Sequence, residues 1–502
     1  MTLHLGEVMN ADPATVDPDA SLAAAAATMR ARGVGSAVVV EGHRVVGILT
    51  ERDVARAVAA GAAPGTEHAR AWMTAAPLTV SPGDELTAAL DRMLDRDFRH
   101  LPVCDGDALV GMVSLRRLVR AASVMRVDPW APSSRGGLEN VKVGSTRLSD
   151  IDGARGRLFY AGYDAVELAR RRSLEEVWHL LHFGELPDAG AGAAFARRLA
   201  ALRESPLDVG WMRDLARGGG SMMSRLQAAV AAAGAALGLK PWHERDPEAA
   251  AAEALHVAAL IPTLLAALVR LDRCETPIPP DASLGHVENY LWMLHGRRPS
   301  HAEIVAASRY MILTADHGMN ASTFTARVVT STGADVGSAL AAAIGALSGP
   351  LHGGAPSLVL DMLDEIGAPE RARDWIADAI ARGRRIMGFG HRVYRAEDPR
   401  AACLRDTAIE IRSGRLVLAR TVESEALAAL RAAKPGRALF TNVEYWSAVA
   451  LDAAGIPRHV FTPTFAAARA IGWTAHILEQ VRDNRLIRPD ADYVGAAERA
   501  VP

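Results

Sequence analysis

The chain has 502 residues, half of them hydrophobic, so it is long enough to form more than one domain with a buried core. Its 56 Lys and Arg residues nearly balance its 58 Asp and Glu residues, which argues against a dedicated nucleic-acid-binding protein. The three cysteines lie far apart and form neither a disulfide framework nor a metal cluster. No leader-like N-terminus and no uncharged apolar run of about 18 residues are present, so we expect a cytoplasmic protein that makes no membrane contact.

The first third of the chain contains an internal repeat. Residues 9–58 align without gaps with residues 73–122, so that Gly47 corresponds to Gly111 at a separation of 64. Each copy has the pattern of a helix, two short strands and a second helix. The predicted elements are helices at 21–32 and 85–94 and strands at 36–40, 45–49, 101–104 and 109–113. Because one repeat unit often cannot bury its own apolar face, we expect the two copies to pack together.

Over residues 1–122 these two copies resemble a tandem pair of CBS domains, a module that commonly senses adenine nucleotides. In that family, a Thr or Ser followed three residues later by Asp closes the nucleotide site. The first copy keeps this pattern as Thr50 and Asp53, whereas the second copy has Ser114 and Arg117. The resemblance therefore implies one regulatory adenine-nucleotide site, at Thr50 and Asp53. The alternative is that these two residues only cap the helix that follows them.

The composition changes after the repeat. Residues 123–136 are rich in Pro, Ser and Gly and predict a linker. From residue 137 onward the chain is rich in Ala, and apolar segments of helical length, such as 249–268 and 336–347, alternate with Gly and Pro turns. This pattern predicts a mostly α-helical fold over 137–502. We therefore expect an α/β pair of small domains followed by a mostly α part.

Short polar motifs in the C-terminal part place reactive side chains beside tight turns. They are Asp-His-Gly-Met-Asn at 316–320, Gly-Pro-Leu-His-Gly-Gly at 349–354, Gly-Phe-Gly-His-Arg at 388–392 and Asn-Val-Glu-Tyr at 442–445. Glycine and proline fix backbone conformations that other residues adopt poorly, so such turns hold a side chain in place. Histidines, a carboxylate and arginines that converge from distant sequence are the groups required by an acid–base site for a small anion.

These motifs resemble the citrate synthase family, and the resemblance covers residues 137–502. It implies a homodimer or higher homo-oligomer of mostly helical subunits, in which a small domain near 356–461 closes over the substrates. It also implies the condensation of an acyl-CoA, most simply acetyl-CoA, with oxaloacetate and water to give citrate and CoA. The CoA thioester is then a substrate, and no further cofactor is required. No group of metal-ligating residues has a convincing spacing, so we expect no metal.

The resemblance assigns roles to individual residues. His352 stabilises the enol of the acyl-CoA, His391 polarises the ketone of oxaloacetate, and these two roles could be exchanged. Glu444 is the base and stands where the family has Asp; one methylene can move a base by about an ångström and cost on the order of 100-fold in rate. The residues implied in substrate binding are His317, Asn320, Arg400, Arg469 and Arg488 for oxaloacetate, the last from the other subunit, and Gly388, Phe389 and Gly390 for CoA.

Two other functions stay open. Propionyl-CoA would give 2-methylcitrate with the same residues, because one methylene in an apolar pocket changes discrimination by only ~1–3 kcal/mol. The second alternative is a weakly active paralogue that senses nucleotides through the CBS pair and uses the synthase-like part as a scaffold. The nearly complete set of histidines and arginines argues against a pure scaffold, because a scaffold has no use for them.

Overall fold

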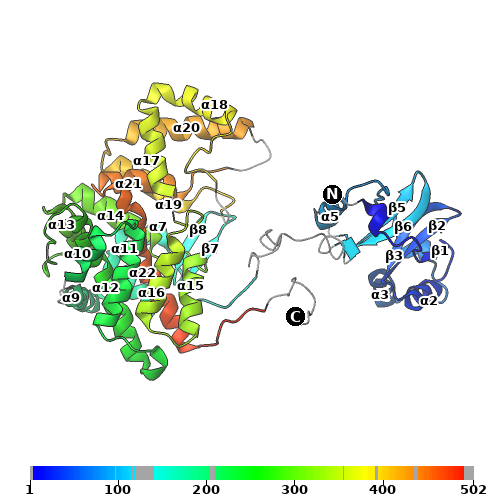
Figure 1. The fold of residues 1–502 in the computed structure, drawn as a ribbon, viewed down its shortest axis with the longest axis horizontal. Helices are drawn as coiled ribbons and strands as arrows, with labels where there is room; N and C mark the ends of the chain where they lie inside the picture. The colour runs from blue at the N-terminus through cyan, green and yellow to red at the C-terminus, as the bar shows by residue number, and fades with distance from the viewer. Residues whose placement is uncertain are drawn as a thin grey trace, which may run out of the picture. The chain divides into compact units, whose positions relative to one another are not determined.

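A computed structural model of the chain describes residues 4–95, 98–115, 117–118, 141–203, 210–353, 355–390, 394–433 and 439–490. The chain divides into two compact units, one that reaches Val141 and one that spans Lys142–Pro489. Figure 1 shows the strands of the first unit and the helices of the second. The linker predicted at 123–136 and the predicted catalytic residue His391 lie outside the described residues.

The first unit is built around a six-stranded sheet in the order β1-β2-β3-β6-β5, with β4 paired to β3. Its strands are β1 (Thr15–Val16), β2 (Ser36–Glu41), β3 (Arg44–Thr50), β4 (Thr74–Ala75), β5 (His100–Asp105) and β6 (Ala108–Ser114). Its helices are α1 (Leu5–Val8), α2 (Leu22–Arg32), α3 (Glu51–Ala59), α4 (Ala69–Trp72) and α5 (Leu86–Asp95). The first helix and both strands predicted for each copy are confirmed, with ends that differ by one or two residues.

The sequence repeat is also a repeat of strand register. In the first hairpin Ser36 pairs with Thr50, and in the second hairpin His100 pairs with Ser114, which is 64 residues later on both strands. Each hairpin has a register shift at the equivalent place along its first strand. Because register fixes which side chains face the core, the two copies present their apolar faces in the same way.

A methionine of each copy packs against a glycine of the other copy. A Cβ atom on Gly47 of the first copy would lie 2.2 Å from Sδ of Met73, which belongs to the second copy. A Cβ atom on Gly111 of the second copy would lie 2.6 Å from Sδ of Met9, which belongs to the first. Each glycine thus makes room for a side chain of the other copy. This exchange fits the expectation that neither copy buries its apolar surface alone.

The second unit begins with a small antiparallel sheet and continues as a helical body. Its strands, in the order β7-β8-β9, are β7 (Ser149–Asp152), β8 (Arg157–Tyr160) and β9 (Tyr163–Asp164). Its helices are α7 (Ala165–Arg171), α8 (Leu174–Phe183), α9 (Ala189–Arg203), α10 (Gly210–Arg217), α11 (Met222–Ala236), α12 (Pro247–Asp272), α13 (His286–His295), α14 (His301–Thr314), α15 (Ala321–Ser331), α16 (Val336–Leu347), α17 (Ala355–Ile366), α18 (Ala372–Ala381), α19 (Pro399–Glu410), α20 (Leu416–Ala433), α21 (Val443–Ala453) and α22 (Phe461–Arg482). Helices α17, α18 and α20 gather at one end of the body, drawn at the top of Figure 1, and α19 and α21 lie below them and pack against α14.

Helix α12 has the length and apolar composition of a membrane-spanning helix, and among the described residues it alone does. However, 78% of its most apolar stretch is buried inside the protein. A helix that is apolar on all sides is expected in the core of a large helical domain, and α12 packs against α9, α10, α11, α13, α16 and α22. Its composition is therefore accounted for by its neighbours within the fold, as predicted for the apolar segments at 249–268 and 336–347.

Helix α22 runs through the centre of the second unit. It packs against α8, α12, α14, α15 and α16, and nearly all of its residues are buried. Two of these buried residues, Arg469 and His476, carry side chains that are costly to remove from water unless they find partners. The partners lie in the turn after α14, so the packing of α22 decides how that turn is held.

Gly472 allows this close approach. A Cβ atom at this position would lie 2.3 Å from the carbonyl oxygen of Ala315 and 2.7 Å from Oδ1 of Asp316. We predict that Gly472→Ala lowers the free energy of unfolding by about 1–3 kcal/mol, because the clash with backbone outweighs the better helix propensity of Ala. Gly414→Ala is the control, since nothing lies within 4 Å of its added Cβ atom, and it should change stability by less than about 0.5 kcal/mol. Chemical denaturation measures both; equal stabilities would contradict the packing argument.

Candidate active site

The turn between α14 and α15 presents His317 from a fixed backbone. Gly318 has φ +60°, a conformation that favours glycine. The carboxylate of Asp316 is completely buried and accepts hydrogen bonds from Oγ of Ser149 and from the N–H of Gly318, the latter at 3.1 Å. The sequence motif at 316–320 is therefore a turn built around a buried carboxylate, and His317 is the residue it exposes to the site.

The imidazole of His317 meets Tyr394, a residue that the sequence analysis did not single out. Nε2 of His317 lies 3.2 Å from Oη of Tyr394, and the two rings meet edge to face. The guanidinium carbon of Arg400 lies 5.7 Å from the centroid of the tyrosine ring. Burial raises the pKa of Tyr394 to about 12, so the phenol keeps its proton at neutral pH. The available signal was the position of Tyr394, three residues after His391.

Arg400 is a buried guanidinium with one carboxylate partner. Asp398 caps α19 and accepts two parallel hydrogen bonds, from Nε at 3.0 Å and from Nη2 at 2.9 Å. Burial opposes the charge of Arg400, but Asp398 outweighs it and raises the pKa of the guanidinium. Within the described part of the chain, Nη1 makes no hydrogen bond. Arg400 is therefore a permanent cation with one edge left for an anion.

Arg469 is a second buried guanidinium, on α22. Nε donates to the carbonyl oxygen of Thr314 at 2.7 Å, and the guanidinium carbon lies 4.7 Å from the ring centroid of Phe465. Burial lowers the pKa of Arg469, and the charge of Asp316 opposes this shift. Neither terminal nitrogen bonds to any residue that the structure describes. A planar fork of this kind matches the two oxygens of a carboxylate.

His352 lies in the turn between α16 and α17. Its Nε2 atom is 2.8 Å from Oγ of Ser322 and 3.3 Å from the backbone nitrogen of the same residue. Because that backbone N–H can only donate, Nε2 accepts, and the proton of the neutral ring lies on Nδ1. Burial, reinforced by the charge of Arg469, lowers the pKa of His352 to about 4. The imidazole is therefore neutral at pH 7 and has a proton to donate from Nδ1.

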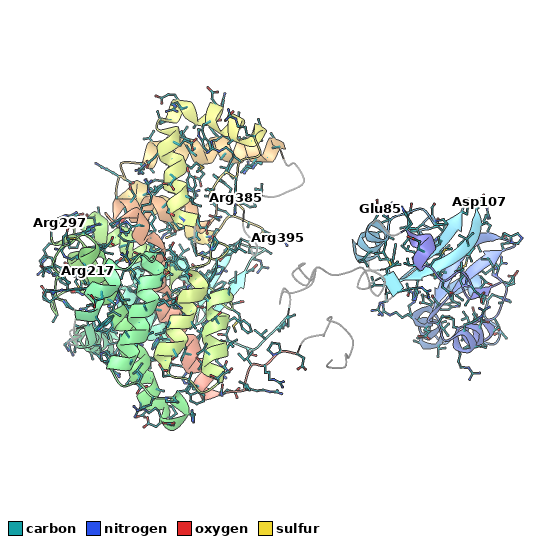
Figure 2. The ribbon with its side chains drawn as sticks, in the orientation of Figure 1. Glu85, Asp107, Arg217, Arg297, Arg385 and Arg395 are labelled. Carbon is teal, nitrogen blue, oxygen red and sulfur yellow. The ribbon has the colours of Figure 1, made fainter. Side chains whose placement is uncertain are left out.

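Glu444 lies in the first turn of α21, which Asn442 caps. Oδ1 of Asn442 accepts from the N–H of Glu444 at 3.1 Å, and Nδ2 donates to the carbonyl oxygen of Gly390 at 3.0 Å. Burial raises the pKa of Glu444, and the charges of Arg385 and Arg400 oppose that shift. Arg385, labelled in Figure 2, lies in the loop that follows α18. A carboxylate with a raised pKa is a stronger base, which suits proton abstraction.

The glycine loop at 388–390 is fixed against the start of α21. Gly388 and Gly390 have φ of +87° and +88°, so the prediction that these turn positions need glycine is confirmed. The N–H of Asn442 donates to the carbonyl oxygen of Gly388 at 2.9 Å, and a Cβ atom on Gly388 would lie 2.7 Å from Cβ of Tyr445. The loop is therefore attached to the start of the helix that carries Glu444, with Phe389 between the two glycines.

The remaining predicted oxaloacetate residues differ in placement. Asn320 caps α15: its Oδ1 accepts from the N–H of Thr323 at 3.0 Å and from Oγ of Ser322 at 2.8 Å. Its side chain thus supports the serine that contacts His352. Arg488 lies exposed on the segment that follows α22 and bonds to no residue that the structure describes. The contacts and charge effects described above bring five of the predicted site residues together. They are His317, His352, Arg400, Glu444 and Arg469.

A separate cavity of about 750 Å³ lies in the first unit, between the two sequence copies. Its lining includes Thr50 and Arg52 from the first copy and Thr79, Arg99 and His100 from the second. A volume of this size suits a small-molecule ligand. Two arginines beside hydroxyl groups and apolar side chains are the surroundings that a phosphorylated ligand with a ring would need.

Asp53 does not line this cavity. Its Oδ2 atom accepts from the N–H and the hydroxyl of Thr50, at 2.8 and 2.7 Å, and its Oδ1 atom pairs with Arg56. Thr50 and Asp53 therefore form a capping box at the start of α3, and Thr50 also lines the cavity. In the second copy, Nε of Arg117 donates to the carbonyl oxygen of Val8 at 2.6 Å. The cation at the equivalent position thus holds the N-terminal helix. Over the described ranges, no three His, Cys, Asp or Glu side chains gather as a metal site.

Family comparison agrees with the motifs. The family model described as "Citrate synthase, C-terminal domain" matches residues 137–490, which is more than half of the chain. The chain belongs to the citrate synthase family. The CBS domain model matches residues 5–60 and 69–124, one match for each sequence copy. The predicted fold class, an α/β CBS pair followed by a mostly α citrate synthase fold, is confirmed, and so is the expectation that the protein is an enzyme of citrate synthase type.

Individual relatives cover the same part of the chain. The chain is 41% identical to a citrate synthase of Haloferax volcanii, over 72% of its own length and 95% of that protein. It is 39% identical to a 2-methylcitrate synthase of Mycobacterium tuberculosis, over 78% and 99%. A solved citrate synthase from Pyrobaculum aerophilum matches with a TM-score of 0.65 and 37% identity, over 73% and 94%. The enzyme from Thermoplasma acidophilum, solved as a ternary complex with carboxymethyl coenzyme A and oxaloacetate, matches with a TM-score of 0.66 and 31% identity, over 73% and 97%.

The protonation state of the His352 imidazole can be tested by titration. We predict that its ring stays neutral from pH 8 down to about pH 5, because its pKa of about 4 lies below the ordinary value near 6.5. The unfolded chain takes up the proton first, so the contribution of His352 to stability is complete above pH 6.5 and is lost as the pH falls toward 4. Histidine-selective NMR, with His352→Asn to assign the signal, measures this. A midpoint near 6.5 would contradict the prediction.

Proposed function

We propose that the protein condenses an acyl-CoA, acetyl-CoA in the first instance, with oxaloacetate and water to give citrate and CoA. The observation that carries this proposal is the set of two buried guanidiniums with open edges, Arg400 and Arg469, beside Glu444, a carboxylate of raised pKa. Oxaloacetate has two carboxylates that suit such forks, and the acyl-CoA has an α-proton that needs a base. The ternary complex of the Thermoplasma acidophilum enzyme supports the same pair of ligand classes.

The reaction follows from these groups. Glu444 takes the α-proton of the thioester, and the electron pair of that C–H bond forms the enolate. The α-carbon then bonds to the ketone carbon of oxaloacetate, and the ketone oxygen takes up a proton. Water finally attacks the thioester carbonyl, and CoA leaves as the thiol. Because the α-proton of a thioester is weakly acidic, donors at both carbonyl oxygens must stabilise the developing negative charge.

The geometry favours a different division of roles between the histidines from the one assigned from the sequence. A substrate carboxylate held by Arg469 would bring the oxaloacetate ketone toward His352, whose charge state Arg469 influences. Since Nε2 of His352 accepts from Ser322, its Nδ1–H is the donor available for that ketone oxygen. We therefore give ketone polarisation to His352, and enol stabilisation to His317 or to His391.

The remaining roles are proposed in the same sense. The loop of Gly388, Phe389 and Gly390, pinned beside the base, is the surface we assign to CoA. Asn320 acts on the oxaloacetate pocket through the serine that contacts His352. Arg488, exposed beyond α22, would complete the oxaloacetate site of a second copy in a homodimer. That proposal is supported by the place of Arg488, which lies beyond the end of α22 with its side chain exposed.

Glu444 carries a direct test of this proposal. We predict that Glu444→Gln abolishes exchange of the acyl-CoA α-protons with D₂O and lowers kcat by at least ~100-fold, because an amide cannot accept the proton. Glu444→Asp should retain or raise activity, since it keeps the carboxylate and restores the shorter side chain of the family. Mass spectrometry of recovered thioester and steady-state assays measure both, with exposed Glu410→Gln as the control. Normal exchange in Glu444→Gln would place the base elsewhere.

The choice of acyl-CoA is the second open point. The 2-methylcitrate synthase relative is a specific reason to test propionyl-CoA beside acetyl-CoA. The ratio of kcat/KM values for the two thioesters, measured with oxaloacetate and without added metal, decides between the two reactions. An absence of turnover with both thioesters would instead favour the nucleotide-sensing paralogue.

We further propose that the cavity in the CBS pair binds one adenine nucleotide per chain and regulates the enzyme. Arg52 and Arg99 would meet the phosphates, and the hydroxyl of Thr50 lies at the same cavity. We predict micromolar or tighter binding of AMP, ADP or ATP, weakened ~10- to 100-fold by Arg99→Ala, because each charge-assisted hydrogen bond contributes about 1.5–3 kcal/mol. Arg56→Ala, which removes a cation outside the cavity lining, is the matched control. Calorimetric titration measures affinity and stoichiometry.

Two outcomes would contradict the nucleotide proposal. Absence of binding by all three nucleotides would leave the pair as a dimerisation or docking module. Equal weakening by Arg99→Ala and Arg56→Ala would mean that the overall charge of the unit matters and the cavity does not. A stoichiometry of two per chain would contradict the assignment of the second copy's Arg117 to the N-terminal helix.

A further inference from the structure

A continuous chain of polar side chains runs behind His317, through the interior of the second unit. Nε2 of His476 lies 3.3 Å from Oδ1 of Asp316. Nη1 of Arg327 lies 3.0 Å from Nδ1 of His476 and 2.6 Å from Oε2 of Glu479. Asp316 and His476 have no exposed surface, and Arg327 is 7% exposed. None of these contacts takes part in the reaction steps given above.

The contacts fix where the proton of His476 lies. Arg327 can only donate, so Nδ1 of His476 must accept its hydrogen bond. The ring proton is therefore on Nε2, and it points at the carboxylate of Asp316. The orientation of this donor is thus set by Arg327, which is itself held by Glu479 on the same face of α22.

Other groups also act on Asp316. Ser149, on β7, and the backbone N–H of Gly318 donate to its carboxylate, and the hydroxyl of Tyr160, on β8, donates to its backbone carbonyl oxygen. Arg469 is the further charge that faces it, from α22. Burial alone would raise the pKa of Asp316, but His476, Arg469 and Ser149 together hold it at about 2.

The charge of Asp316 matters to two substrate-facing groups. Its carboxylate organises the turn that carries His317, through the bond from the N–H of Gly318. It is also the largest influence that keeps buried Arg469 charged against the effect of burial. A protonated Asp316 would loosen the turn and remove the counter-charge of a guanidinium that we assign to oxaloacetate.

We propose that His476, oriented by Arg327, is a positioning residue for catalysis, which keeps Asp316 ionised and thereby holds His317 and Arg469 ready for substrate. The inference rests on the proposed condensation. It differs from a role in fold stability alone, because it makes activity depend on the ionisation of one buried carboxylate.

The test compares His476→Leu with His476→Gln in the full-length protein. Leu removes the donor, so kcat/KM should fall ~10- to 100-fold at pH 7, and an acidic limb should appear because Asp316 now titrates within the assay range. Gln can donate from Nε2 to Asp316 and accept from Arg327 with Oε1, so it should recover most of the activity and the original pH profile. Asp316→Asn should be slow at every pH and have no new limb.

The matched control is His286→Leu. His286 is also almost completely buried, at 2% exposed, and its Nδ1 atom has no hydrogen-bond partner among the described residues. This control removes a buried imidazole from the same unit without touching Asp316, so its pH profile should equal that of the wild type. A profile of wild-type shape in His476→Leu, or the same new limb in His286→Leu, would overturn the proposal.

A second measurement separates failure of this inference from failure of the proposed function. Absence of condensation by the wild type would sink the proposed function alone. The free energy of unfolding against pH still reports on Asp316. With a folded pKa near 2, Asp316 stabilises the wild type above about pH 4, and this contribution is lost as the pH falls. In His476→Leu the pKa of Asp316 in the folded state should rise above its value in the unfolded chain. The difference in free energy of unfolding between the variant and the wild type should therefore shrink toward acid pH. An unchanged difference across pH would overturn the proposal independently of activity.

Discussion

The burial of two guanidiniums is the constraint around which the helical unit is arranged. Removing an ion from water costs several kcal/mol even after the protein relaxes, so a buried cation persists only with compensation. Arg400 has a full bidentate partner in Asp398, whereas Arg469 has a carbonyl oxygen and the nearby charge of Asp316. Both guanidiniums thus keep nitrogens without a hydrogen-bond partner among the described residues, and these open edges favour the binding of an anion.

The groups around these cations lie at helix ends. His317 follows α14, His352 follows α16, Arg400 lies in the first turn of α19 and Glu444 in the first turn of α21. Helix ends leave backbone groups without intrahelical partners, and side-chain caps satisfy them and fix the local geometry. Two of these caps, Asn320 and Asn442, belong to the site motifs, and the third, Asp398, is the partner of Arg400. One set of residues therefore both starts the helices and places the chemistry.

The state of Glu444 shows two effects in competition. A carboxylate in the first turn of a helix is stabilised in its charged form by the helix dipole, and two arginines act in the same direction. Burial acts in the opposite direction and wins, so the pKa rises. The extra methylene relative to the Asp of the family lets the carboxylate extend farther from the cap. Whether that reach helps or hinders depends on where the thioester carbon lies, which is why Glu444→Asp is informative.

Much of the fold could be predicted because its signals are local. The repeat located the first helix and both strands of each copy, apolar periodicity located α12 and α16, and Gly388 and Gly390 marked the turn that needed positive φ. The contacts of Tyr394 and His476 could not be predicted in this way. The partner of His476 lies 160 residues away, and the contact exists only because α22 packs against the turn after α14. The only sequence signal was that His476 stands seven residues after Arg469, on the same face of a helix.

The two copies of the CBS pair have the same fold, but residues at equivalent positions make different contacts. The first copy contributes Thr50 and Arg52 to the cavity and the second contributes Arg99, whereas Arg117 of the second copy holds the N-terminal helix. A ligand at one site can shift the enzyme only by its differential affinity for two states, typically ~1–3 kcal/mol, and substrate must act on the ligand by the same factor.

Residues near the start of the second unit contact both ends of the buried polar chain. The first described residues of the second unit lead into Arg147, whose N–H donates to Oε1 of Glu479 at 2.8 Å. Ser149, two residues later, donates to Asp316. Glu479 and Asp316 are the two ends of the buried chain through Arg327 and His476. A displacement of this segment would therefore disturb both ends of the chain that holds His317.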